Sequence, residues 1–276
     1  MKIKYLGTAA AEGIPALFCQ CETCEKARKT GIIRSRAQAI IDDCILLDFG
    51  PDTFYHMAEN GIDLGSIRRI FITHAHEDHL SEFEIENLRD SCYSHPKKGE
   101  PFNFYGSKPV LEKLGKYVER FTERDTLPVL NEMSHGRTVE FDGYRVTSVH
   151  AKHSENTGPL FYIINKGDKT LMYCHDTSYF PDDTWEYLKS HPFHADFISI
   201  DCTAGNDPRD SGSHMSVNQN LKVRDRLTEM GIMDDSTIFC LNHFSHNGYD
   251  VLPDELEPIL KANGIYQSED KKVFEF

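Results

Sequence analysis

The sequence predicts an α/β protein in which two mixed β-sheets pack on each other and helices cover the outside. Short apolar or alternating runs recur along the chain with turn residues between them, as is typical of strands. Helical patterns occur between several of these runs. The order of the elements fits neither a strict βαβ alternation nor a helix-free sandwich. Two packed sheets with outer helices is therefore the simplest architecture.

Each element follows from the spacing of its apolar residues. Strands are expected in residues 1–7, 39–50, 68–74, 101–106, 144–150, 160–176, 195–201 and 236–243. Residues 165–168, Asn-Lys-Gly-Asp, lie between two apolar runs and predict a hairpin turn. Helices are expected at about 52–60, 80–92, 109–121, 181–190, 215–230 and 253–262. A single domain is expected over residues 1–276, with residues 91–137 interpreted as an insertion because they hold few strong strands.

The composition indicates a folded protein and argues against polyanionic partners. The hydrophobic fraction of 39% is ordinary for a globular chain. A formal charge of −14 repels DNA, RNA and anionic membranes, although metal ions can reverse the field locally for a small anionic substrate. The N-terminus lacks a signal-peptide pattern, and no stretch approaches the ~18 apolar residues of a membrane helix. We therefore expect a cytoplasmic protein with no nucleic-acid or membrane partner, and a homodimer is compatible with these data.

The segment after the 68–74 strand is the most informative part of the chain. His74-Ala75-His76-Glu77-Asp78-His79 places three imidazoles and a carboxylate at a strand-to-helix junction. His74 and His76 are two residues apart in extended chain, so they point the same way and can share one metal. Asp78 and His79 are expected on the first turn of the helix, facing a second metal. Separate surface histidines are the weaker interpretation, because desolvating four such groups together is costly unless they bind something.

Later strand ends offer the remaining ligands of a dinuclear site. His153 follows the 144–150 strand, Asp176 ends the 160–176 run, and His243 ends the 236–243 run. We expect His74, His76 and His153 around one metal, Asp78, His79 and His243 around the other, and Asp176 as the bridge. Mixed imidazole and carboxylate ligands suit Zn or Mn, or Fe. His150 competes with His153, because the phase of a loop is not readable from sequence, and His175 should point away from the site on its strand.

The 74–79 run resembles the metal-binding signature of the metallo-β-lactamase superfamily, and the later candidate ligands occur along the chain in the same order as in that family. The resemblance implies an αββα sandwich of two mixed sheets flanked by helices. Asp48 matches an early aspartate of the family, which implies that it orients the ligand loop without binding metal. True β-lactamases generally lack counterparts of His79 and Asp176, so antibiotic hydrolysis is not expected.

A second cluster lies near the N-terminus. Cys19, Cys21 and Cys24 are three thiols within six residues, and they can wrap one tetrahedral zinc with His246 as the proposed fourth ligand. Three ordinary thiols or a redox pair is the alternative, because C-x-x-C alone is a weak signal. The cysteines at 44, 174, 202 and 240 lie in apolar runs and are interpreted as core residues.

Together with Gly7-Thr8-Ala9 and the His243-Phe244-Ser245-His246 motif, these features resemble PhnP-type phosphodiesterases over essentially the whole chain. That resemblance implies hydrolysis of small phosphodiesters, such as cyclic ribose phosphates, and a structural zinc at the cysteines. His214 matches the family's proton donor. The chain departs from the pattern at Ala9, at His175 and in the longer 91–137 region, so the fold and metals transfer more safely than the substrate.

The expected reaction is attack on phosphorus by a metal-bridging hydroxide, with His214 protonating the leaving alkoxide. Asp78 and Asp176 are assigned to catalysis as well as to metal binding. Arg34 and Arg36 receive no catalytic role, since such arginines more often lie on a solvated face. An RNA-processing nuclease of the same superfamily and a non-catalytic metal-holding or partner-binding protein are the alternatives.

Overall fold

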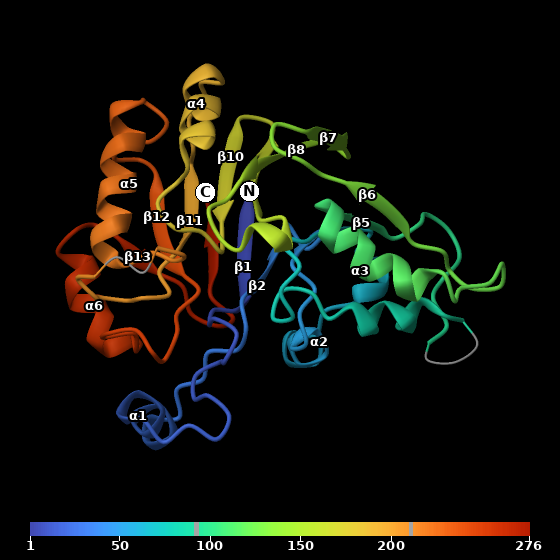
Figure 1. Ribbon diagram of the computed structural model, residues 1–276, viewed down its shortest axis with the longest axis horizontal. Helices are drawn as coiled ribbons and strands as arrows, with labels where there is room; N and C mark the ends of the chain where they lie inside the picture. Colours follow the sequence, from blue (N-terminus) through green and yellow to red (C-terminus); the bar gives the residue numbers. More distant parts are fainter. Residues whose placement is uncertain (91–93, 210–211) are drawn as a thin grey trace.

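The computed structural model describes residues 1–90, 94–209 and 212–276, and within them the chain forms two seven-stranded sheets. The sheets face each other, with helices on the two outer sides (Figure 1). Both sheets contain parallel and antiparallel pairs. The predicted architecture of two mixed sheets flanked by helices is therefore confirmed.

The first sheet has the order β14-β1-β2-β3-β4-β5-β6. The pairs on either side of β2 are antiparallel, whereas β3 to β6 run parallel. Its strands are β1 (Lys2–Gly7), β2 (Gln38–Ile41), β3 (Ile45–Leu47), β4 (Arg69–Phe71), β5 (Asn103–Gly106), β6 (Val129–Glu132) and β14 (Val273–Glu275).

The second sheet has the order β13-β12-β11-β10-β9-β8-β7. Its strands β7 to β10 form an antiparallel meander, and β10 to β13 are parallel. They are β7 (Thr138–Phe141), β8 (Tyr144–His150), β9 (Leu160–Lys166), β10 (Lys169–Cys174), β11 (Phe197–Asp201), β12 (Ile238–Asn242) and β13 (Tyr266–Gln267). The predicted hairpin turn at 165–168 joins β9 to β10.

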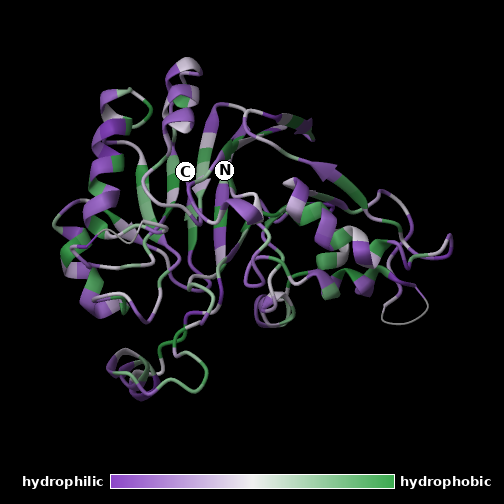
Figure 2. Ribbon diagram, viewed as in Figure 1, coloured by the Kyte–Doolittle hydropathy of each residue, from purple (hydrophilic) through white to green (hydrophobic). Residues whose placement is uncertain are grey.

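Three apolar layers hold the sandwich together. One lies between the sheets, where Tyr5 and Phe71 meet Tyr162 and Phe197. The other two lie between each sheet and its helices. Figure 2 shows mostly hydrophobic colours along β11 and β12 and mixed colours along the helices. The helices are α1 (Glu22–Thr30), α2 (Thr53–Asn60), α3 (Lys108–Val118), α4 (Asp182–Ser190), α5 (Val217–Glu229) and α6 (Pro253–Lys261), with short 3₁₀ helices η1 (Leu64–Ser66), η2 (Glu82–Leu88) and η3 (Glu155–Thr157).

Some elements differ from the sequence expectations. The helix expected at 80–92 is the 3₁₀ helix η2, and its residues 91 and 92 lie outside the described part. Ile85 and Leu88 are three residues apart, so a three-residue turn brings both against the first sheet. The strands β6, β7, β13 and β14 and the helix α1 were not predicted, since each is short or rich in polar residues.

The 91–137 region contributes to the first sheet. Its strands β5 and β6 extend the sheet beyond β4, and α3 connects them. Residues 91–93 lie outside the described part, and the interpretation of 91–137 as an insertion stays a prediction. Among the described residues no helix is long and apolar enough to cross a membrane.

Candidate metal centre

The site lies where several strands of both sheets end. The parallel neighbours β10, β11 and β12 are in register, with Cys174 beside Ile200 and Asp201 beside Asn242. Their carboxyl ends therefore deliver Asp176, Asp201 and His243 to the same edge of the second sheet. Strand β4 of the first sheet delivers the 74–79 run to this edge. The sandwich thus brings together residues that are up to 169 positions apart in the sequence.

The 74–79 run forms a hydrogen-bonded turn. The backbone N–H groups of His79 and Leu80 donate to the carbonyl of His76 at 3.2 and 2.8 Å. Asp78 and His79 therefore lie in this turn, ahead of η2, and not on the first turn of a helix as expected. The turn reverses the chain, so it separates the His74 and His76 pair from the Asp78 and His79 pair.

The first ligand group consists of His74, His76, His153 and Asp176. Nδ1 of His76 lies 2.9 Å from Nε2 of His74 and 3.1 Å from Nε2 of His153. One oxygen of Asp176, Oδ2, lies 3.5 Å from Nε2 of His74 and 3.7 Å from Nε2 of His153. Such spacings are those of donor atoms that surround a common point.

The second ligand group consists of Asp78, His79, Asp176 and His243. Nε2 of His79 lies 3.2 Å from Nε2 of His243 and 3.2 Å from Oδ2 of Asp78. The other oxygen of Asp176, Oδ1, lies 2.7 Å from Nε2 of His243 and 3.5 Å from Nε2 of His79. Asp176 thus turns one oxygen to each group.

The residues present fit divalent cations at both groups. Asp176 is only 3% exposed, and both of its oxygens face imidazole nitrogens at 2.7–3.7 Å, so the buried carboxylate is aimed into the space that the two groups share. The donor sets are imidazole and carboxylate, which suit divalent transition metals. The cluster is therefore a site for divalent metal binding.

Carboxylates raise the proton affinity of the second group. Burial lowers the pKa of His243, but the charge of Asp176 and hydrogen bonds with Asp176 and Asp78 outweigh it and raise this pKa to about 10. Burial also lowers the pKa of His79, and the charges of Asp78 and Asp48 reverse that shift to well above the ordinary value. Without a metal these imidazolium groups neutralise the carboxylates, so metal binding must displace protons.

In the first ligand group the pKa values of two histidines are lowered. Burial and the positive charge of His79 hold the pKa of His74 well below its ordinary value. Burial also lowers the pKa of His153. Both side chains are therefore neutral near pH 7, which is the form that binds a metal.

Asp48 contacts the ligand loop and lies outside both ligand groups. Its Oδ2 accepts a hydrogen bond from Nδ1 of His79 at 2.7 Å, and its Oδ1 accepts from N and Oγ1 of Thr73 at 2.8 and 2.9 Å. This directs Nε2 of His79 toward the second group. The backbone φ angles of Asp48 and His243 are positive, 69° and 65°. Such conformations are energetically costly for residues other than glycine, and they cluster at functional sites.

His214 lies beside the second group, held by residues that the sequence analysis did not single out. Its Nδ1 donates to Oδ2 of Asp201 at 2.8 Å, and its ring stacks on His243 and meets the ring of His153 at a tilt. Oγ1 of Thr203 contacts Nδ1 of His243 at 2.8 Å. Asp201 is the last residue of β11, and Asp176 follows the end of β10 in the same way. A carboxylate at the end of a strand was therefore the sequence signal that could have indicated Asp201.

Two other histidines lie outside the ligand groups. His150 ends β8 and contacts Asp183 of α4 at 2.8 Å, and it belongs to neither ligand group. His175 is buried, contacts Oγ of Ser199 at 2.8 Å and belongs to neither ligand group.

The expectation of a solvated face was wrong for Arg34. Its side chain is only 2% exposed, contacts Oγ1 of Thr8 and the carbonyl of Ser268, and lies 4.3 Å over the ring of Phe244. A buried guanidinium is tolerated because these acceptors and the ring replace water. Arg36 is half-buried and pairs with Asp52.

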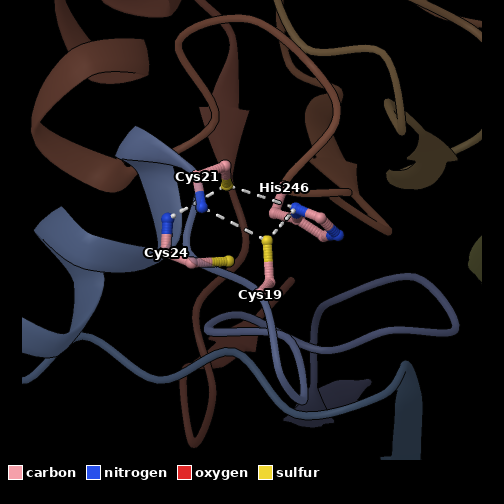
Figure 3. A group of neighbouring side chains, drawn as sticks. All are labelled: Cys19, Cys21, Cys24 and His246. Carbon is pink, nitrogen blue, oxygen red and sulfur yellow. Dashed lines mark hydrogen bonds between the residues drawn. The ribbon is translucent and has the colours of Figure 1, made fainter.

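The cysteine run and His246 form a separate cluster (Figure 3). Nδ1 of His246 lies 3.6 Å from Sγ of Cys19 and 3.5 Å from Sγ of Cys21. Cys21 caps the N-terminus of α1 by accepting from the backbone N–H of Cys24, which places Cys24 one turn further on. The three sulfur atoms and the imidazole face a common point, as a tetrahedral zinc site requires.

The remaining described cysteines lie apart from this cluster. Cys174, Cys202 and Cys240 are buried in apolar layers, and Cys44 is half-buried beside Tyr144. All seven cysteines within the described residues are free thiols.

Comparison with known proteins identifies the family. Residues 44–233 match the β-lactamase superfamily domain, which covers more than half of the chain. The chain therefore belongs to this superfamily and has the metallo-β-lactamase fold.

Individual relatives match only part of this chain. The chain is 31% identical over 160 residues to ribonuclease Z of Methanothermobacter thermautotrophicus, covering 56% of this chain and 45% of that protein. It is 27% identical over 128 residues to coenzyme PQQ synthesis protein B of Methylobacterium radiotolerans, covering 41% and 40%. These matches thus span less than half of the length of either relative.

Solved structures with the same fold cover the whole chain. Zn²⁺-bound PqqB of Methylobacterium extorquens has a TM-score of 0.76 at 17% identity, covering 100% of both chains. A diphosphatase from the PhnP family has a TM-score of 0.73 at 21% identity, covering 100% and 97%. The short form of human tRNase Z has a TM-score of 0.68 at 17% identity, covering 100% and 99%. At these identities the likeness shows the fold alone, and it confirms the predicted metallo-β-lactamase sandwich.

Proposed function

We propose that this protein is a dinuclear metal phosphodiesterase that hydrolyses small anionic phosphodiesters of the cyclic ribose phosphate type. The observation that carries the proposal is the pair of ligand groups that share Asp176, with the His214–Asp201 pair beside them. Two metals a few ångströms apart suit in-line displacement at phosphorus, because one site can hold the attacking group and the other the leaving group.

The ligand roles follow from the two groups. His74, His76 and His153 would hold one divalent ion, Asp78, His79 and His243 the other, and Asp176 would bridge them. Zn or Mn, or Fe, fits these donors. When bound, such ions supply Lewis acidity and make water nucleophilic near neutral pH. Cys19, Cys21, Cys24 and His246 would hold a structural zinc away from the reaction.

His214 is proposed as the proton donor to the leaving oxygen. Because Nδ1 of its ring donates to Asp201, Nε2 is the atom that presents a proton to the substrate. Burial lowers the pKa of His214, but the charge and hydrogen bond of Asp201 raise it above the ordinary value overall. This direction favours the protonated imidazole that a general acid needs.

An RNA-processing nuclease is the second candidate, favoured by the 31% identity to ribonuclease Z. The net charge of −14 weighs against it, since the phosphate backbone of a folded RNA needs a cationic surface. Turnover of a cyclic ribose phosphodiester and of a structured RNA, measured with metal-replete protein, separates the two candidates. A rate on RNA far above that on the small diester would favour the nuclease, and no turnover of either would favour a non-catalytic protein.

The test of the mechanism is the dependence on the leaving group. His214→Ala should lower hydrolysis of alkyl diesters by roughly 10²–10⁴-fold, the range of general acid catalysis. A nitrophenyl diester leaves as a stabilised phenolate that needs little protonation, so the loss there should be much smaller. His150→Ala is the matched control, since His150 pairs with Asp183 outside both ligand groups. Equal losses on both substrates would contradict the role as proton donor.

A further inference from the structure

A cavity of about 670 Å³ lies on the outer side of the first sheet. Its floor is the outer face of β3, β4 and β5, and its walls come from α2, η1, η2 and residues 94–97. None of the residues of the two ligand groups or of the cysteine cluster lines it. The volume falls within the ~300–1,000 Å³ that small-molecule sites occupy.

The interior of this cavity is apolar. Leu46, Ile70 and Phe104 line it from the sheet, and Met57 and Ile85 line it from the helical side. Figure 1 shows α2 and α3 on this side of the first sheet. A concave surface of this composition favours an apolar ligand body over water.

Within the part of the chain that the structure describes, the guanidinium of one arginine in the cavity makes no hydrogen bond or ion pair. The guanidinium of Arg68 lies 3.9 Å from the centre of the Phe102 ring, and both residues line the cavity. Nη1 of Arg68 is buried without a hydrogen-bond partner among the described residues. The neighbouring Arg69, by contrast, pairs with Glu100 and Asp142. A buried guanidinium donor without an acceptor is costly and calls for an anion.

The carboxylates that line the cavity are engaged elsewhere. Oδ1 of Asp63 accepts from the backbone N–H of Gly65, which caps η1. Oε2 of Glu84 accepts from Nδ2 of Asn87. Lys97 adds a second positive charge at the exposed rim. The charge at Arg68 is therefore left for a ligand.

We propose that this cavity binds an amphipathic monocarboxylate, with its apolar tail against Leu46, Ile70 and Phe104 and its carboxylate on Arg68. A planar guanidinium matches a carboxylate in a two-bond contact, and Phe102 holds the guanidinium plane in place. The site is distinct from the metal centre and does not depend on which phosphodiester the protein hydrolyses.

The experiment is calorimetric titration of the metal-replete protein with decanoate, with 1-decanol as the neutral analogue. Decanoate should bind saturably with one site per chain, and decanol should bind at least about tenfold more weakly. Arg68→Gln should weaken decanoate binding by about 10–100-fold, the range for hydrogen bonds to charged groups. Arg145→Gln is the control, because Arg145 is exposed on β8 of the other sheet and its removal changes the net charge equally.

A second variant tests the cavity without touching the charge. Met57→Trp adds bulk from α2 and should reduce the affinity for decanoate while leaving the thermal midpoint close to that of the wild type. Absence of saturable binding at millimolar decanoate would overturn the proposal. Equal losses in the Arg68 and Arg145 variants, or equal affinity for decanoate and decanol, would also overturn it.

Discussion

Asp48 provides the sharpest test of how the second ligand group is organised. Its carboxylate bonds Nδ1 of His79 through Oδ2 and both N and Oγ1 of Thr73 through Oδ1. Asp48→Asn keeps an acceptor for Thr73. Asparagine also tolerates the left-handed backbone, here with φ of 69°, better than most residues. The substitution therefore removes mainly the charged contact with His79.

The expected magnitude follows from that single contact. Loss of a group that orients a metal-binding histidine typically lowers metal affinity by about 10–100-fold, which is about 1.4–2.7 kcal/mol. The affinity of the second group should fall by this amount, and that of the His74, His76 and His153 group should change less. Competition with a chromophoric chelator measures both affinities.

A matched control is available within the same chain. Asp43 also has a left-handed backbone, with φ of 58°, but its side chain is 65% exposed and pairs with Lys2. Asp43→Asn should leave metal affinity unchanged. If Asp48→Asn bound both metals as tightly as the wild type, the orienting role assigned to Asp48 would be refuted.

Three further predictions concern the pH dependence of metal binding, the zinc site at the cysteines and the burial of Arg34. The pKa values of His79 and His243 are raised in the metal-free protein, so metal binding should release protons, and apparent affinity should rise with pH from the acid to the alkaline side of neutrality; pH-independent affinity would contradict this. Cys21→Ser should lower the melting temperature by several degrees, at about 2–4 °C per kcal/mol, with little change in turnover of the folded fraction; a disulfide among the cluster cysteines in reduced, metal-replete protein would exclude the zinc site. Arg34→Met should lower the free energy of unfolding by about 3 kcal/mol in denaturant titrations, since it leaves the carbonyl of Ser268 and Gln267 without their buried donor. A loss no larger than that of an exposed arginine would show that the buried contacts contribute little.

The sequence determined the parts of the site that are adjacent along the chain. The 74–79 run carries its ligands within six residues, so the covalent spacing alone predicts two pairs that face two points. The cysteine run is local in the same way, because its three thiols lie within six residues, although the helix α1 that Cys21 caps was seen only in the structure. The layered fold also followed from the periods of the apolar runs, which depend on local geometry.

The tertiary structure decided which residues near the strand ends reach the metal centre. His150 and His153 are only three residues apart, and the sequence alone left both as candidates. Pairing of β8 with β9 continues through His150, so its side chain meets Asp183 of α4, whereas His153 lies in the loop beyond the strand end and reaches His76. The part of Asp201 in holding His214 likewise depends on the register of β10, β11 and β12. Arg34 is buried because segments more than 200 residues later, at Ser268 and Phe244, close over it, and no local pattern around residue 34 reports contacts at that separation.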